Sequence, residues 1–104
     1  MIGIYRIVNQ ATDRTYIGSS VNMRERLNKH RRQLRHGTHG NTRLQRSWNK
    51  HGHEPFVFEV LVQCVRDVLE QREQEFIDAY YEHGLPLYNL MPSAGSRTGF
   101  RYVP

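Results

Sequence analysis

Cysteine occurs only once in the chain of 104 residues, as Cys64, so no internal disulfide can form. No apolar run approaches the roughly 20 residues that a membrane-spanning helix needs. Met1 is followed directly by Ile2 and Gly3, without the charged and apolar regions of a secretory signal peptide. These absences exclude a disulfide-stapled scaffold and a membrane span, and they predict a reducing, cytoplasmic setting.

Lysine is also scarce, because 13 of the 15 basic residues are arginine. The planar guanidinium of arginine binds phosphate through paired hydrogen bonds, so this bias favours phosphate-bearing partners. Acidic residues number 10, which leaves a net charge of +5. Hydrophobic residues make up 38% and aromatic residues 11%, a composition typical of a folded domain. The length predicts one domain with one modest core.

The charges are divided between two parts of the chain. Residues 23–53 contain nine Lys or Arg and a single acid, Glu25, which gives a local net charge of +8. Residues 54–83 contain two Arg and eight acids, which gives −6. A cationic segment of this kind suits a polyanion, because each neutralised phosphate releases condensed counterions. A solvated helix face explains the same charge, so charge alone leaves both interpretations open.

The pattern of apolar and turn-forming residues predicts three strands and three helices. Residues 2–8 and 15–18 read as two strands of a β-hairpin. One helix is predicted from a cap within 19–22 to about 35, and another from 41 or 42 to 52. The run 56–62 is more apolar than alternating, which predicts a central strand between the two hairpin strands. A third helix is predicted over 66–81.

The hairpin places two tyrosines close together. Tyr5 and Tyr16 should lie roughly opposite one another, within about two residues of register. Gly3 and Gly18 flank the pair, and a glycine within a strand often marks the close approach of a ligand or of another backbone.

Two polar residues lie beside the apolar stripe of the first predicted helix. Met23, Leu27 and Leu34 fall within about 40° of each other on a helical wheel and form that stripe. His30 lies about 20° from it and Arg26 about 60° from it. A position at this edge can reach a cleft while staying anchored, so this pair is better placed for chemistry than the outward arginines.

One carboxylate falls in the middle of the apolar face of the third predicted helix. Glu73 lies between the directions of Leu69, Phe76 and Ile77 on the helical wheel. An unpaired buried carboxylate costs several kcal/mol, so we expect it to hold a proton, a cation or a metal. A salt bridge to an arginine of the first helix, a metal or catalytic role, and a different helix register all stay open. An isolated carboxylate suits Mg²⁺, which keeps several waters and takes one or two protein ligands.

The motifs resemble those of the GIY-YIG nuclease family. Gly3-Ile4-Tyr5 is followed eleven residues later by Tyr16-Ile17-Gly18, and both tripeptides are unaltered. Arg26, His30, His39, Glu73 and Asn89 follow in the family's order, and residues 44–52 resemble the phage and intron-encoded homing endonucleases. The resemblance implies an α/β fold, a small three-stranded antiparallel sheet flanked by helices. It places the catalytic domain at 1–91 and a linker-like tail at 92–104.

The same resemblance implies hydrolysis of a DNA phosphodiester with one divalent ion, Mg²⁺ or Mn²⁺, and no small-molecule cofactor. By position, Glu73 is the metal ligand, Tyr5 activates the attacking water and Tyr16 is its hydroxyl-bearing partner. Arg26 stabilises the phosphate, and His30 corresponds to a histidine that relays the proton of the tyrosine in some members. His39 and Asn89 match further positions of the site. Predicted DNA-binding residues are Arg24, Arg31, Arg43, Arg46 and Lys50.

Two points stay open in the sequence. An unperturbed tyrosine is only about 0.1% ionised at pH 7. Either Arg26, the metal and an acceptor such as His30 favour tyrosinate, or Tyr5 passes its proton on as it takes one from water. The nuclease is expected to be a monomer. The alternative function is a non-catalytic nucleic-acid-binding module on the same scaffold.

Overall fold

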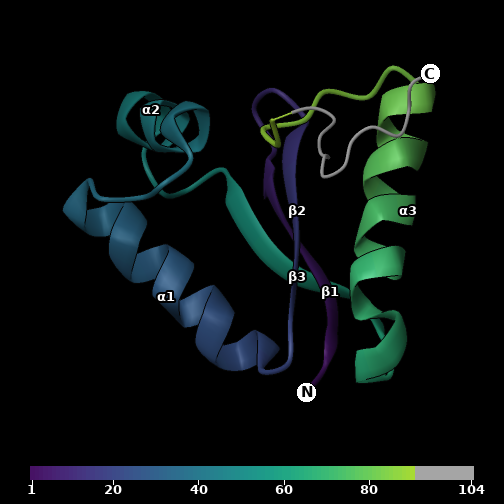
Figure 1. Ribbon diagram of the computed structural model, residues 1–104. Coiled ribbons are helices and arrows are strands. Elements are labelled where there is room, and N and C mark those ends of the chain that lie inside the picture. The colour runs from purple at the N-terminus through teal and green to yellow at the C-terminus, as the bar shows by residue number, and fades with distance from the viewer. Residues whose placement is uncertain (91–104) are drawn as a thin grey trace.

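A three-stranded sheet lies between helices in the computed structural model, which describes residues 1–90 (Figure 1). In chain order the elements are β1 (Gly3–Asn9), β2 (Arg14–Ser20), α1 (Met23–His36), α2 (Thr42–His51), β3 (Phe56–Gln63), the 3₁₀ turn η1 (Arg66–Val68) and α3 (Leu69–Glu82). In Figure 1 the strands separate α1 and α2 on the left from α3 on the right. The linker-like tail predicted at 92–104 lies outside the described residues.

The sheet is antiparallel throughout, with the order β2-β1-β3. The first strand is therefore central, and the prediction that the run 56–62 forms the central strand is wrong. β3 is apolar because both of its faces are covered by helices. Phe56 and Phe58 pack with Trp48 of α2, whereas Leu61 and Val62 pack in the cluster that includes α3. The strand is therefore apolar because helices pack on both of its faces, although it has only one neighbouring strand.

Two apolar clusters fill the spaces on either side of the sheet. On the α1 side, Tyr5 and Ile7 of β1 pack with the predicted helical stripe of Met23, Leu27 and Leu34. On the α3 side, Ile4, which directly precedes Tyr5, packs with Ile77. The alternation along β1 thus sends successive side chains to opposite faces, as the pleat of a strand requires.

The helices begin and end close to their predicted limits. The Asn22 side chain accepts a hydrogen bond from the Glu25 N–H at the start of α1, and Gly37 ends that helix with a positive φ of 74°. Asn41 accepts from the Leu44 N–H in the same way at the start of α2. The third helix starts three residues later than predicted, because 66–68 forms η1 and no side chain caps either turn. No helix in residues 1–90 is long and apolar enough to cross a membrane.

The register of the hairpin places both tyrosines on the α1 side of the sheet. Tyr5 pairs with Gly18, and Tyr16 pairs with Ile7, so the two tyrosines are offset by two residues. A Cβ at Gly18 would lie 2.4 Å from the Tyr5 hydroxyl oxygen, and one at Gly3 would lie 2.1 Å from the Val62 carbonyl oxygen. The close approach of another backbone is confirmed at Gly3. Gly18 instead makes room for a side chain, the Tyr5 ring, which the prediction of a ligand or backbone did not include.

Gly18→Ala should destabilise the fold by about 1–3 kcal/mol, because the Tyr5 ring fills the space of the added methyl group. Gly40→Ala is the matched control, since a Cβ there meets nothing within 4 Å. Its unfolding free energy should stay within about 0.5 kcal/mol of the unaltered protein. Urea unfolding of the three proteins measures both effects, and equal stability of the two variants would contradict the packing described here.

Candidate active site

A cleft of about 560 Å³ opens beside β2 and collects five of the seven predicted catalytic residues. Tyr16 comes from β2, Arg26 and His30 from α1, His39 from the loop before α2, and Asn89 from the segment after α3. The remaining lining residues, which the sequence analysis did not select for the site, are Lys29, Gln33, Gly40, Asn41 and Leu90. Tyr5 and Glu73 do not line the cleft. The Tyr5 hydroxyl contacts His30, which lines it, and the charge of Glu73 acts on Tyr16, which also lines it.

Tyr5 is the inner end of a chain of hydrogen-bonded rings. Its hydroxyl lies 2.6 Å from Nε2 of His30, and Nδ1 of His30 lies 2.7 Å from Nε2 of His39. The other ring nitrogen of His39, Nδ1, accepts a hydrogen bond from the Asn41 backbone N–H at 2.9 Å. Tyr5 is 1% exposed and His30 is 6% exposed, so the inner links are shielded from water.

The backbone N–H of Asn41 sets the direction of every hydrogen bond in this chain. A backbone N–H can only donate, so Nδ1 of His39 carries no proton and the proton of the neutral ring is on Nε2. That Nε2–H donates to Nδ1 of His30, which places the proton of His30 on Nε2. His30 therefore donates to the hydroxyl oxygen of Tyr5. The proton of Tyr5 is left to point away from His30.

Burial keeps the hydrogen-bonded rings of Tyr5, His30 and His39 neutral. Burial and the neighbouring His39 lower the pKa of His30 to about 4, and burial lowers the pKa of His39. Burial raises the pKa of Tyr5 well above its usual value, with a smaller contribution from Tyr16. The pKa of Tyr16 is raised by burial and then by the charge of Glu73. The guanidinium of Arg26 acts against both shifts, because its positive charge favours either tyrosinate.

Glu73 is half-buried on α3 and accepts a hydrogen bond from the Ser19 hydroxyl of β2. Its position on the apolar face of the helix is confirmed, since Leu69, Phe76 and Ile77 pack around the same face. The salt bridge to an arginine of α1 is not formed. Among residues 1–90 the ion pairs are Arg6–Glu59 and Arg72–Glu75. Ser19 directly follows the second tripeptide, a signal that the sequence analysis did not use.

The Glu73–Ser19 pair and the two tyrosines lie on opposite faces of the sheet, and they meet at the edge strand β2. Ser19 pairs with Ile4, whose side chain packs on the α3 side, whereas Tyr5 and Tyr16 lie on the α1 side. Because β2 has a strand on one side only, groups from both faces adjoin at its outer edge. The charge of Glu73 accordingly acts on both tyrosines.

Asn89 ties the segment after α3 to that edge. Its side chain accepts from the Ile17 N–H and donates to the Ile17 carbonyl, both at 2.8 Å. Tyr88 N–H donates to the Thr15 carbonyl, which continues the attachment along β2. Asn89 thereby satisfies the outward backbone groups of the second tripeptide and closes one wall of the cleft.

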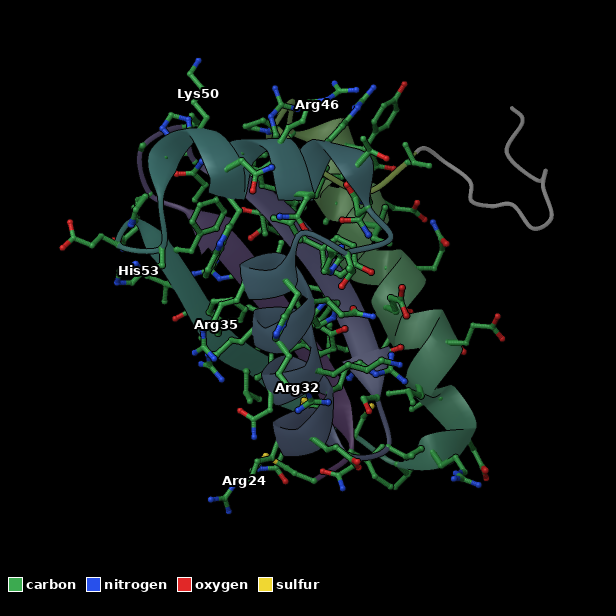
Figure 2. The ribbon with its side chains drawn as sticks, turned by 90° about the vertical axis from the view of Figure 1, so that its left-hand side faces the viewer. Arg24, Arg32, Arg35, Arg46, Lys50 and His53 are labelled. Atoms are coloured by element: carbon green, nitrogen blue, oxygen red, sulfur yellow. The ribbon has the colours of Figure 1, made fainter. Side chains whose placement is uncertain are left out.

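The predicted DNA-binding residues are spread over α1 and α2. Arg24 is exposed in the first turn of α1, and Arg46 and Lys50 are exposed on α2 (Figure 2). Arg43 is also exposed on α2. Arg31 instead lies over the Phe58 ring of β3, with its guanidinium carbon 4.3 Å from the ring centre. Arg31 therefore covers part of the core and does not line the cleft.

The donor set suits a metal ion that keeps most of its water. No cluster of three or more His, Cys, Asp or Glu side chains able to hold a metal occurs within residues 1–90. Glu73 supplies one oxygen-bearing carboxylate beside a hydroxyl, without a competing ion pair among those residues. Mg²⁺ takes one or two carboxylates with waters completing the shell, so the site fits a hard cation of this kind and not a closed zinc site.

Known proteins share sequence and fold with this chain. The family model of the GIY-YIG catalytic domain matches residues 1–85. The chain is 35% identical over 79 residues to the intron-associated endonuclease 1 of Enterobacteria phage T4, covering 72% of this chain and 31% of that protein. This chain thus corresponds to about a third of the length of that relative.

Two solved structures share the fold. The catalytic domain of homing endonuclease I-TevI superposes with a TM-score of 0.76 at 30% identity, covering 88% of this chain and 100% of that one. A glutamate-to-alanine mutant of the same catalytic domain gives a TM-score of 0.73 at 28% identity, covering 90% and 96%. The fold predicted from the sequence, a three-stranded antiparallel sheet flanked by helices, is confirmed. With the family model matching most of its length, this chain belongs to the GIY-YIG catalytic domain family.

Proposed function

We propose that this chain is a divalent-metal-dependent DNA endonuclease, the catalytic module of a homing-type or mobile-element nuclease. The observation that carries the proposal is the convergence of a buried tyrosine, a half-buried tyrosine, a guanidinium, a histidine pair and a carboxylate at the edge strand β2. The similarity to an intron-associated endonuclease and to a homing endonuclease domain supports it.

Phosphodiester hydrolysis needs an activated water, compensation for charge on the phosphoryl oxygens and assistance to the departing 3′ oxygen. Arg26 is exposed in the cleft and can bind two phosphoryl oxygens. Glu73 would hold the divalent ion, Mg²⁺ or Mn²⁺. When bound, such an ion stabilises negative charge on the phosphate and on the leaving oxygen.

Tyr5 is the proposed base, and the direction of its hydrogen bond defines how it can act. As a tyrosinate it would accept the hydrogen bond that His30 already donates, while Arg26 favours its negative charge. It would then take one proton from the attacking water, whose oxygen forms the new bond to phosphorus as the 3′ oxygen leaves. Because Nε2 of His30 already carries a proton, we infer that Tyr5 releases its own proton to an acceptor other than His30. His30 is then a hydrogen-bond donor to Tyr5 and not the acceptor in a proton relay.

A non-catalytic binding module is the alternative, and nicking of supercoiled plasmid separates the two. DNA as the partner, the monomeric state and the cytoplasmic location are part of the proposal. The lone half-buried cysteine and the absence of a membrane-spanning helix among residues 1–90 are compatible with it.

Glu73→Gln should reduce metal-dependent nicking at least about 100-fold, because a neutral amide binds a hard cation poorly and several kcal/mol of stabilisation are lost. Glu75→Gln is the matched control, since Glu75 is exposed on the same helix and pairs with Arg72. The assay compares Mg²⁺ with excess EDTA. Full nicking by the Glu73 variant, or nicking in EDTA, would refute the proposed metal site. Retention of plasmid without nicking by any protein would favour the binding module.

Tyr5→Phe should lower the nicking rate by about 10²- to 10⁴-fold, the usual contribution of a general base. The variant keeps the ring that packs against Gly18 and removes only the hydroxyl. Tyr81→Phe removes a hydroxyl from an exposed tyrosine of α3 and should leave the rate unchanged. A fully active Tyr5 variant would remove Tyr5 as the base.

The histidine tautomers should be visible by nitrogen-15 NMR of the imidazole rings. We expect Nε2 protonated and Nδ1 unprotonated in both His30 and His39 at pH 7, with His30 still neutral at pH 5. Since the pKa of His30 is lowered on folding, the unfolded chain binds more protons, and stability should fall as the pH drops from about 6.5 toward 4. His30→Gln should remove that part of the pH dependence. A proton on Nδ1 of His30 would overturn the assigned direction.

A further inference from the structure

A second cavity, of about 420 Å³, lies where the start of β2 meets α2. It is lined by Arg14, Arg43, Arg46, Ser47 and Tyr88. Three of the five lining side chains carry a guanidinium group, two carry a hydroxyl, and none carries a carboxylate. The sequence analysis selected two of these arginines but missed Arg14, because it belongs to the hairpin and not to the cationic segment 23–53.

The three arginines are gathered without a neutralising partner in the described part of the chain. Arg14 is held in place by donating to the Leu87 carbonyl at 3.0 Å, and its guanidinium carbon lies 5.9 Å from the centre of the Tyr88 ring. Arg43 and Arg46 lie one turn apart on α2 and are exposed. The ion pairs of residues 1–90 lie elsewhere, at Arg6 and Arg72. Like charges held together repel one another, so this cavity favours an anion.

The chemistry of the cavity matches phosphate. Guanidinium groups bind phosphate oxygens through paired hydrogen bonds, and the Ser47 hydroxyl can donate another. α2 itself contains three cations and no acidic residue, and Figure 2 shows Arg46 and Lys50 projecting outward from it. No lining residue would repel a dianionic or monoanionic phosphate.

The cavity adjoins the candidate catalytic cleft. Tyr88 lines the cavity, and the next residue, Asn89, lines the cleft. Asn41 lines the cleft and donates through its side chain to the Tyr88 carbonyl at 3.0 Å. Consecutive residues of one segment therefore form a wall of both spaces. A continuous polyanion can occupy both, whereas a free phosphate fills only one.

We propose that Arg14, Arg43 and Arg46 form a second phosphate site that binds the DNA backbone beside the linkage held in the catalytic cleft. The identity of the polyanion rests on the proposed endonuclease function. The site itself is a binding site, so its test does not depend on cleavage.

The test measures binding of a fluorescein-labelled DNA duplex in EDTA, so that no cleavage occurs, over a range of NaCl concentrations. The variant is Arg43→Gln with Arg46→Gln, which leaves Arg14 and its contacts to Leu87 and Tyr88 intact. The matched control is Arg35→Gln with Arg66→Gln, an equal loss of charge at exposed positions that line neither space. Gln retains helix propensity, and circular dichroism with urea unfolding confirms that all the proteins are folded.

We expect the slope of log K against log salt to be about 2 smaller in magnitude for the Arg43/Arg46 variant, since each lost phosphate contact removes close to one released counterion. The control pair should change the slope by less than about 0.5. One neutral methylphosphonate linkage is then moved along the duplex. At the linkage that Arg43 and Arg46 contact, it should weaken binding by the unaltered protein and leave binding by the variant unchanged. Equal slopes for the two variants would overturn the proposal.

Inorganic phosphate, compared with chloride at equal ionic strength, distinguishes a site for free phosphate from one for DNA. If phosphate raises the thermal unfolding temperature of the unaltered protein, and the Arg43/Arg46 variant binds the duplex as well as the control does, the ligand is free phosphate and the proposal is wrong. Loss of nicking in the variant is not needed for the proposal, because binding in EDTA is its readout.

Discussion

The hydrogen bond from the Asn41 backbone N–H to His39 is the contact on which the chemistry of the site depends. It makes Nδ1 of His39 an acceptor, and each later link to His30 and Tyr5 takes its direction from that. The same residue begins α2, since its side chain accepts from the Leu44 N–H. The start of a helix and the direction of the hydrogen bond to a buried tyrosine are therefore coupled. A shift of α2 by one residue would remove both the cap and the donor that orients the ring chain.

The edge position of β2 has a similar organising effect on the carboxylate. A central strand has a neighbouring strand on each side, which keeps groups on the α3 face apart from groups on the α1 face. β2 lies at the edge of the sheet, so groups from the two faces can approach each other there. Ser19 can then hold Glu73 from one face while Gly18 makes room for Tyr5 on the other. Asn89 seals the backbone of the same strand without adding a fourth strand. The tripeptides 3–5 and 16–18 thus supply more than the two tyrosine hydroxyls, because Gly18 makes room for the Tyr5 ring and the Ile17 backbone holds Asn89.

Much of the fold and of the site could be predicted because local rules decide them. The caps at Asn22 and Asn41, the stripe of Met23, Leu27 and Leu34, and the inward position of Glu73 follow from spacing along a helix. The strand order could not be predicted, because the run 56–62 is apolar for contacts with helices on both faces. The direction of the histidine chain depends on one backbone N–H in a loop, which no residue pattern encodes. Arg14 joins α2 only through the tertiary fold.

The uneven charge of the sequence becomes an asymmetry between the two layers of helices. The cationic segment supplies α1 and α2, and the acidic segment supplies β3 and α3. Figure 1 shows α3 on the side of the sheet opposite to α1 and α2. A polyanion is therefore attracted to the α1 and α2 side and repelled by the outward carboxylates of α3. Glu73 escapes that separation because it points toward the sheet and reaches its edge beside Ser19. The carboxylate proposed to hold the metal thus reaches the edge strand that also carries Tyr16 of the cleft, while the remaining acids of α3 stay behind the sheet, where they would not oppose the approach of phosphate.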